Sequence, residues 1–164
     1  MNLVNLEQWV ERASRGDREA FKKIYQEFKE MVYRACWAAT LEKESTKDLF
    51  QEIWLKVYLG FPTLKETRKF PGWLRAIVNR KIIDYIRSKE KEKSVCLSEN
   101  LDFAQISDPT TTIEVQKLLN YLSPKERYLF YLHYFEGLSL KEIAEELGLN
   151  LSTVKMTLHR GNKN

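Results

Sequence analysis

Helical periodicity of the apolar residues constrains the fold of this 164-residue chain more than any other feature. Between residues 17 and 40, apolar side chains such as Phe21, Ile24 and Phe28 recur every three or four positions, which places them on one side of a helix. This run begins after Asp17, a residue type that commonly caps helix N-termini. Alternating apolar and polar stretches of strand length do not occur in the sequence. The sequence therefore predicts an all-α fold.

Three more helices are predicted in the first 93 residues. They span about 6–14, 45–59 and 73–93. The middle one opens at Ser45, with Asp48 three residues later in the arrangement of a capping box. Pro71 precedes the last one, at a position where helices commonly start. Four helices would then make up one small domain, residues 1–93.

The segment 94–111 separates this domain from a second helical one. It is rich in Ser, Asn, Asp and Thr and poor in large apolar residues, which is typical of a flexible linker. The second domain is expected over 112–164, with a first helix from Thr112 or Ile113. A further helix follows the Ser123-Pro124 cap and ends before Gly137. The predicted fold class is thus two small helical domains joined by a linker.

A helix-turn-helix motif occupies the end of the chain. Ser139 and Glu142 form a second capping box, which opens a two-turn helix. Ala144 is small enough for two helices to cross closely, Gly148 can adopt the positive φ of a sharp turn, and Val154 would fill the junction. A second helix, about 151–160, follows and is predicted to read DNA.

The exposed side of this second helix supplies the predicted DNA contacts. If Val154 and Leu158 face inward, Ser152, Met156 and His159 point outward, with Lys155 at the margin and Leu151 nearer the core. Residues near the N-terminus of such a helix contact base edges, while Lys and Arg bond phosphates. The candidate set is Leu151, Ser152, Lys155, Met156, His159 and Arg160.

Basic residues concentrate in a second place. Residues 65–93 carry ten Lys or Arg against four Asp or Glu, although the net charge of the whole chain is only +4. Along the predicted helix 73–93, one side would hold Ala76, Asn79, Arg80, Ile83 and Arg87. Basic side chains beside aromatic rings suit single-stranded nucleic acid. A plain solvated face over a buried Trp73 is the alternative, and for Trp73 itself we favour a core position.

Several function classes are excluded. Apolar runs are too short for the roughly 20 residues of a membrane span, and no secretory signal is recognisable, so we expect a cytoplasmic protein without membrane insertion. Cys36 and Cys96 are isolated, which argues against a metal site or a disulfide. Neither a nucleophile with its base nor a phosphate-binding loop is present. We therefore expect a binding protein with no catalytic residues, metal or cofactor.

Three stretches resemble sigma factors of the sigma-70 family, in particular the extracytoplasmic-function (ECF) group. They are Asp48-Leu49-Phe50-Gln51-Glu52; Trp73-Leu74 with Ile77, Asp84 and Arg87; and Thr153-Val154-Lys155 with Leu158-His159-Arg160. Ser123 to Arg127 and Gly137 to Ala144 resemble the fourth region of the same family. The likeness covers about 15–93 and 112–160.

The resemblance implies a function and assigns roles to residues. Such a protein binds core RNA polymerase at its β′ clamp and β flap and directs transcription initiation at promoters. The polymerase contacts would be Asp48, Gln51 and Glu52. The melted strand of the minus-10 element would meet Arg75, Asn79, Arg80, Ile83 and Arg87, and the duplex minus-35 element would meet the exposed set on helix 151–160. The resemblance also implies an anti-sigma protein as a partner, since members of the group commonly have one.

Two departures from the family and one alternative function are visible. Position 80, usually Asn in the family, is Arg, whereas Asn79 lies one place earlier, about 100° round the helix. After Arg160 the family's basic tail is replaced by Gly161 and three further residues, so we expect the last helix to end early. The alternative function is a stand-alone helix-turn-helix regulator with a sensing or dimerising N-terminal half. A nucleic-acid-processing enzyme with an accessory helix-turn-helix is a third class.

Overall fold

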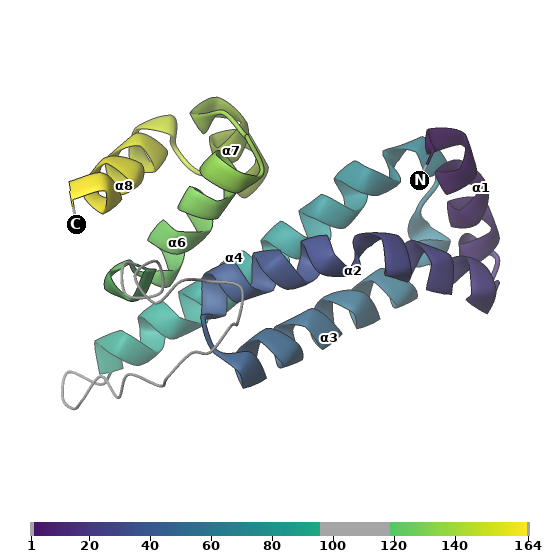
Figure 1. The fold of residues 1–164 in the computed structure, drawn as a ribbon, viewed down its shortest axis with the longest axis horizontal. Coiled ribbons are helices and arrows are strands. Elements are labelled where there is room, and N and C mark those ends of the chain that lie inside the picture. Colours follow the sequence, from purple (N-terminus) through teal and green to yellow (C-terminus); the bar gives the residue numbers. More distant parts are fainter. Residues whose placement is uncertain (1, 96–118, 164) are drawn as a thin grey trace.

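Helices make up all the secondary structure that could be described. The computed structural model describes residues 2–95 and 119–163, and every regular element in these ranges is helical (Figure 1). The all-α prediction is confirmed for this part of the chain. The predicted helix start at Thr112 or Ile113 and nearly all of the predicted linker lie outside the described residues.

Four helices form the first half. Their bounds are α1 (Leu3–Ser14), α2 (Arg18–Thr40), α3 (Lys43–Gly60) and α4 (Phe70–Val95). Two 3₁₀ turns, η1 (Phe61–Thr63) and η2 (Thr67–Lys69), connect α3 to α4. The helices α2, α3 and α4 lie alongside one another, and α1 crosses one end of them (Figure 1). This bundle supports the surfaces of α3 and α4 described below.

The second half carries the helix-turn-helix. It consists of α6 (Pro124–Phe130), a π-helical turn η3 (Tyr131–Phe135), α7 (Leu140–Leu147) and α8 (Leu151–Lys163). Gly148 has a φ of +64° between α7 and α8, the left-handed conformation expected of it. In η3 the Glu136 amide donates to the Tyr131 carbonyl at 3.1 Å, five residues back, so this turn is wider than an α-helical one.

Helix caps form where the sequence predicts them in three of four places. The Asp17 carboxylate accepts from the amides of Glu19 and Ala20 at 3.0 and 3.2 Å. Reciprocal capping boxes are present at Ser123 with Glu126 and at Ser139 with Glu142. The hydrogen bonds at the Asp17 cap lower the pKa of that carboxyl, which stabilises its charged form at the helix N-terminus.

The capping box predicted at Ser45 is wrong. The helix α3 begins two residues earlier, at Lys43, and the Ser45 hydroxyl donates to the Glu42 carboxylate at 2.7 Å. Thr46 is buried, and its hydroxyl donates a hydrogen bond to the Glu42 carbonyl at 2.7 Å. The same hydroxyl is also hydrogen-bonded to the Thr40 hydroxyl. The start of α3 is therefore fixed by contacts with the end of α2.

The predicted early end of the last helix is also wrong, since α8 continues to Lys163. A Cβ atom at Gly161 would lie 2.3 Å from Cε2 of the Phe130 ring. Real Cβ contacts are not that short, so glycine at this position lets α8 pack directly on α6. The glycine serves helix packing here and does not end the helix.

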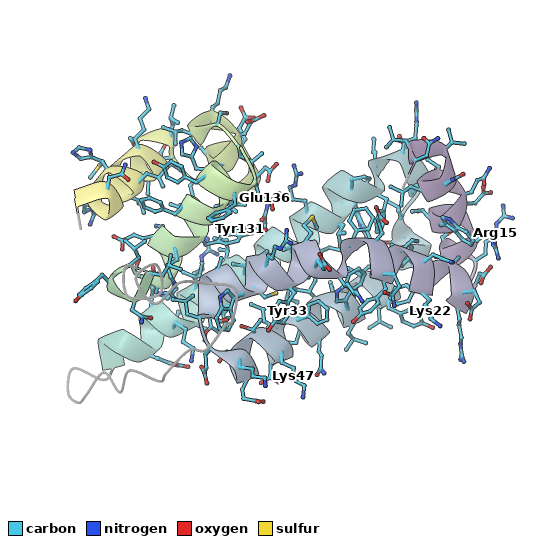
Figure 2. All side chains as sticks on the ribbon, viewed as in Figure 1. Arg15, Lys22, Tyr33, Lys47, Tyr131 and Glu136 are labelled. Carbon is cyan, nitrogen blue, oxygen red and sulfur yellow. The ribbon has the colours of Figure 1, made fainter. Side chains whose placement is uncertain are left out.

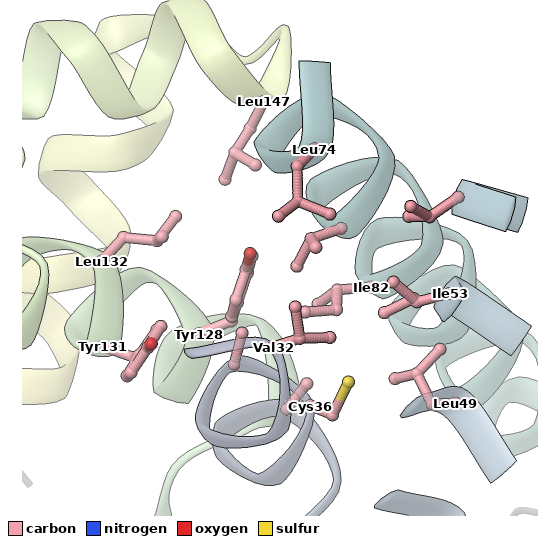
Figure 3. Close-up of a cluster of buried hydrophobic side chains, with 14 of the residues drawn as sticks. Val32, Cys36, Leu49, Ile53, Leu74, Ile82, Tyr128, Tyr131, Leu132 and Leu147 are labelled. Atoms are coloured by element: carbon pink, nitrogen blue, oxygen red, sulfur yellow. The ribbon is translucent and has the colours of Figure 1, made fainter. Parts of the chain in front are cut away.

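The buried core is continuous between the two halves. Figure 3 shows Tyr128 of the second half close to Val32 of the first, and Leu132 and Ile82 belong to the same cluster of buried side chains. Tyr128 is 1% exposed, and Cys36 of α2 belongs to the same cluster. Burial raises the pKa of the Cys36 thiol to about 12. Along α3, three apolar residues spaced by four form the inward-facing stripe and are buried: Leu49, Ile53 and Val57.

Candidate polymerase and nucleic-acid surfaces

The outer side of α3 presents the first predicted site. Asp48, Gln51 and Glu52 are all exposed, because the buried stripe of this helix faces the other way. The Glu52 carboxylate lies 3.8 Å from Nζ of Lys81 on α4. In Figure 1, α3 lies on the side of the bundle away from α7 and α8, and in Figure 2 Lys47 projects from it into open space. This surface is accessible in the present arrangement.

Sequence reasoning missed two leucines on the same side of α3. Leu55 and Leu59 are 59% and 65% exposed and follow Glu52 at intervals of three and four residues. They form an apolar extension of the acidic edge. The sequence does indicate their exposure, because neither position continues the four-residue spacing of the buried residues at 49, 53 and 57. Exposed leucines beside a polar edge are typical of a protein contact.

An open pocket lies where the chain enters α4. It has a volume of about 560 Å³ and is lined by residues of the 63–73 segment, including Lys65, Lys69 and Trp73. The Trp73 ring is half-buried and packs on Phe61 and Phe70, with ring centroids 5.8 and 5.9 Å apart. Trp73 thus contributes to the core, as expected, while it also lines the pocket. Contact of its ring with nucleic acid stays a prediction.

A basic strip continues from the pocket along α4. Trp73, Arg80 and Arg87 are spaced by seven residues, or nearly two helical turns, and so share one side about 10 Å apart. Arg80 and Arg87 are exposed, and Ile83 between them is half-buried. Three of the five predicted minus-10 residues therefore lie on one open surface that leads out of the pocket.

Arg75 and Asn79 face the second half instead. Asn79 is 4% exposed, so the expectation that it shares the exposed side with Arg80 is wrong in this structure. Its Nδ2 donates to a Glu146 carboxylate oxygen at 3.1 Å, and its Oδ1 accepts from the Tyr128 hydroxyl. The other Glu146 oxygen pairs with Arg75 Nη1, also at 3.1 Å. The predicted set is thus divided between two sides of α4.

The outward side of α8 is arranged as predicted. Val154 and Leu158 are buried, whereas the remaining candidates are exposed: Ser152, Lys155, Met156, His159 and Arg160. Leu151 is 38% exposed and therefore lies farther out than the sequence suggested. An exposed polar and basic side on the second helix of a helix-turn-helix is what major-groove contact requires.

Comparisons with known proteins match both halves of the chain. The profile described as "Sigma-70 region 2" matches residues 24–92, and "Sigma-70, region 4" matches residues 112–163. The ECF RNA polymerase sigma factor SigW of Bacillus subtilis (strain 168) is 30% identical over 169 residues, covering 93% of this chain and 90% of SigW.

This chain belongs to the sigma-70 family, in its ECF group. A second relative, the ECF sigma factor SigE of Mycolicibacterium smegmatis (strain ATCC 700084 / mc(2)155), is 27% identical over 89% of this chain and 61% of its own length. The fold matches that of the sigma factor RpoE from Bartonella quintana, solved with the anti-sigma factor NepR. The TM-score is 0.62 at 18% identity, covering 87% of this chain and 92% of RpoE.

In this sigma factor, the region 2 match covers most of α2, all of α3 and α4 as far as residue 92. The alternative of a stand-alone regulator does not account for that match, because such a protein would need only the helix-turn-helix. The two regions touch one another along α2 and α4.

Arg127 of region 4 joins the two regions. The residue is 8% exposed. Its guanidinium donates to the carbonyls of Ala38 and Ala39 at 3.2 and 2.9 Å, and to that of Leu122 at 2.7 Å. The first two carbonyls are in the last turn of α2, where a helix leaves its carbonyls unpaired. Burial lowers the pKa of Arg127 to about 10, so it stays charged at neutral pH.

Neither a metal site nor a membrane span emerges from residues 2–95 and 119–163. Within them, no three His, Cys, Asp or Glu side chains are grouped as a metal site would need, and none of the helices is long and apolar enough to cross a bilayer. The expectation of no cofactor remains a prediction.

Proposed function

We propose that this sigma factor works in the cytoplasm as a non-catalytic subunit of RNA polymerase, with α3 as the polymerase contact and α4 and α8 as the promoter contacts. The observation that carries the proposal is the basic strip of α4, which gives region 2 a nucleic-acid surface of its own, separate from the helix-turn-helix. A protein with two such surfaces can hold two promoter elements at once.

The polymerase contact would combine charge and apolar area. Asp48 and Glu52 supply the acidic groups, and Leu55 and Leu59 supply apolar surface that has no cover in this structure. Together they form a strip along α3 that is polar toward the N-terminus of the helix and apolar toward its C-terminus, and protein contacts combine both kinds of surface. We assign this strip to the β′ clamp.

The melted minus-10 strand would follow the pocket and the strip. A base fits in the pocket beside Trp73, because an aromatic ring and flanking lysines offer stacking and charge together. Arg80 and Arg87 are then placed to bond phosphates of the strand backbone. This arrangement favours Arg80 over Asn79 as the first contact of the strand, since Asn79 is enclosed.

The duplex minus-35 element would meet α8. Ser152 and Met156 are on its exposed side near the N-terminus, where recognition helices contact base edges, while Lys155 and Arg160 can reach phosphates. Exposed aromatics near the end of η3, Tyr134 and Phe135, form an apolar patch suited to the β flap. An anti-sigma protein stays a predicted partner.

The polymerase contact can be tested by replacing Asp48, Gln51 and Glu52 together with alanine. Each side chain is exposed, so we expect each change to alter the free energy of unfolding by no more than about 0.5 kcal/mol. Co-elution with core RNA polymerase on size exclusion should be lost, together with promoter-dependent transcription.

A matched control carries alanine at three exposed positions elsewhere, namely Gln26, Glu90 and Glu145. It removes one amide and two carboxylates, as the α3 variant does, and therefore the same charge. It should bind polymerase like the unmodified chain. Survival of polymerase binding in the α3 variant would contradict the assignment, as would unfolding of that variant at ambient temperature.

A further inference from the structure

The last residue of α3, Gly60, lies against the aromatic ring that lines the pocket. A Cβ atom at Gly60 would be 2.9 Å from Cζ2 of Trp73 and 3.3 Å from its Cη2. Real Cβ contacts are longer than the first of these distances, so the indole rests directly on the backbone of α3 because residue 60 has no side chain. The backbone angles of Gly60, φ −85° and ψ −15°, are those of a right-handed helix, which alanine adopts with better propensity. Packing against Trp73, and not backbone conformation, therefore accounts for glycine here.

Two buried rings limit where the indole can move. Phe61 and Phe70 are 2% and 0% exposed and stack on one another, with ring centroids 5.5 Å apart and an interplanar angle of 15°. Trp73 packs on both of them and is itself half-buried. Because close-packed buried rings make no room for an added group, a methyl at position 60 would displace the indole into the open space beside it. That space is the pocket.

Gly60 also holds a second wall of the pocket. The Thr63 hydroxyl donates to the Gly60 carbonyl at 2.6 Å, and Thr63 lines the pocket together with Trp73. Figure 1 shows α3 ending near the start of α4, at the end of the bundle that α1 crosses. One residue of α3 thus fixes two pocket-lining side chains, Thr63 through its carbonyl and Trp73 through its missing Cβ.

We propose that Gly60 is a positioning residue of the strand pocket, which lets the Trp73 indole lie back on the end of α3 and so keeps the pocket open for a base. The proposal rests on the function assigned to the pocket above. Gly60 is not among the residues that line the pocket, so it acts through Trp73.

The size of the effect follows from the stacking that the pocket would lose. An indole displaced into the pocket excludes the base that would stack on it there, and one such contact is worth at least about fivefold in affinity. Arg80 and Arg87 keep their exposed positions, so binding should weaken and not vanish. We expect Gly60→Ala to bind single-stranded DNA about tenfold more weakly.

The test is a double-mutant cycle in the full-length chain, with Gly60→Ala, Trp73→Phe and the two changes together. Phenylalanine keeps an aromatic ring at position 73 but lacks the outer ring of the indole, to which Cζ2 and Cη2 belong. The methyl at position 60 then has room. The Trp73→Phe chain is therefore the matched background for the same substitution at position 60.

Two measurements are made on all four chains. The first is affinity for a six-nucleotide single-stranded DNA of mixed sequence, by anisotropy at low salt. Gly60→Ala should lower it about tenfold beside Trp73 and by less than about twofold beside Phe at that position. The second is acrylamide quenching of tryptophan emission, in which the contribution of Trp73 is the part that Trp73→Phe removes. This contribution should be quenched more strongly in Gly60→Ala, because the displaced indole is more exposed.

Unchanged quenching and unchanged affinity in Gly60→Ala would overturn the proposal. An equal loss of affinity in both backgrounds would overturn it too, since the methyl would then act without Trp73. If Gly60→Ala does not fold, the double variant decides: one that folds and binds DNA like Trp73→Phe supports the clash with the indole, and one that also fails to fold refutes it.

Failure of the proposed function gives a different result. Stronger quenching of Trp73 in Gly60→Ala without any loss of DNA affinity would show that Gly60 does position the ring but that the strand does not use the pocket. That outcome refutes the assignment of the pocket to the melted strand, and with it the role of Gly60 in strand binding.

Discussion

Replacing Arg127 with methionine should loosen the joint between the regions. Methionine keeps the apolar stem of the side chain but removes every donor. Two of the three hydrogen bonds of the guanidinium cross to α2, at Ala38 and Ala39. At about 1.5 kcal/mol each, the lower end for a charged donor, the loss is about 3 kcal/mol. For a chain of this length that corresponds to a fall in the thermal midpoint of about 6 to 12 °C.

Urea unfolding followed by tryptophan fluorescence and by far-ultraviolet circular dichroism measures this loss. All four tryptophans are in the first half, at positions 9, 37, 54 and 73, so fluorescence reports region 2 while dichroism reports all helices. In the Arg127→Met chain we expect part of the dichroism signal to be lost before the fluorescence changes, because region 4, without its bonds to α2, unfolds at a lower urea concentration than region 2.

The control is Arg18→Met, the same substitution at an exposed position at the start of α2. It should change the free energy of unfolding by no more than about 0.5 kcal/mol. If the Arg127 variant proves as stable as this control, the buried guanidinium does not hold the halves together and the estimate above is refuted.

Three other changes test the packing and the DNA contact. Burial raises the pKa of Tyr128 and Tyr131 above that of a free phenol. The unfolded chain loses these two protons near pH 10, so the contribution of the pair to stability is full below that pH and falls above it by about 2.7 kcal/mol per pH unit. A flat thermal midpoint between about pH 9 and 11 would contradict this. Gly161→Ala should lower the free energy of unfolding, measured with urea, by about 1 to 3 kcal/mol, because the added Cβ meets the Phe130 ring. Helix propensity alone predicts that the same change raises the free energy of unfolding. Lys155→Ala should reduce the slope of the logarithm of the duplex-binding constant against the logarithm of the salt concentration by about one unit. An unchanged slope would show that Lys155 does not contact a phosphate.

Local features of the fold were predictable because their determinants lie within a few residues. The caps at Asp17, Ser123 and Ser139 each bond an amide two or three positions ahead, so the sequence contains the whole motif. The start of α3 was not predictable in this way, because Thr46 bonds to Thr40 across the turn between two helices. Tertiary contact there overrides the local capping signal.

In the candidate surfaces too, exposure was predictable only where it depends on spacing within one helix. Exposure along α8 followed from helical spacing, since Val154 and Leu158 define which side faces inward. The position of Asn79 did not, because its partners Tyr128 and Glu146 are 49 and 67 residues away in the sequence. Spacing within α4 says nothing about which distant helix will cover one of its sides.

The wide turn η3 amounts to one extra residue inserted into a helix. It lets Tyr131 and Leu132 remain in the core while Phe135 is 83% exposed. An α-helical residue advances the chain by about 100°, so deleting one residue within 131–135 would rotate everything that follows by that angle relative to α6. The direction in which α8 faces is thus set by a single-residue insertion upstream of the motif. An insertion or deletion at this place would change that direction without altering any residue of α8.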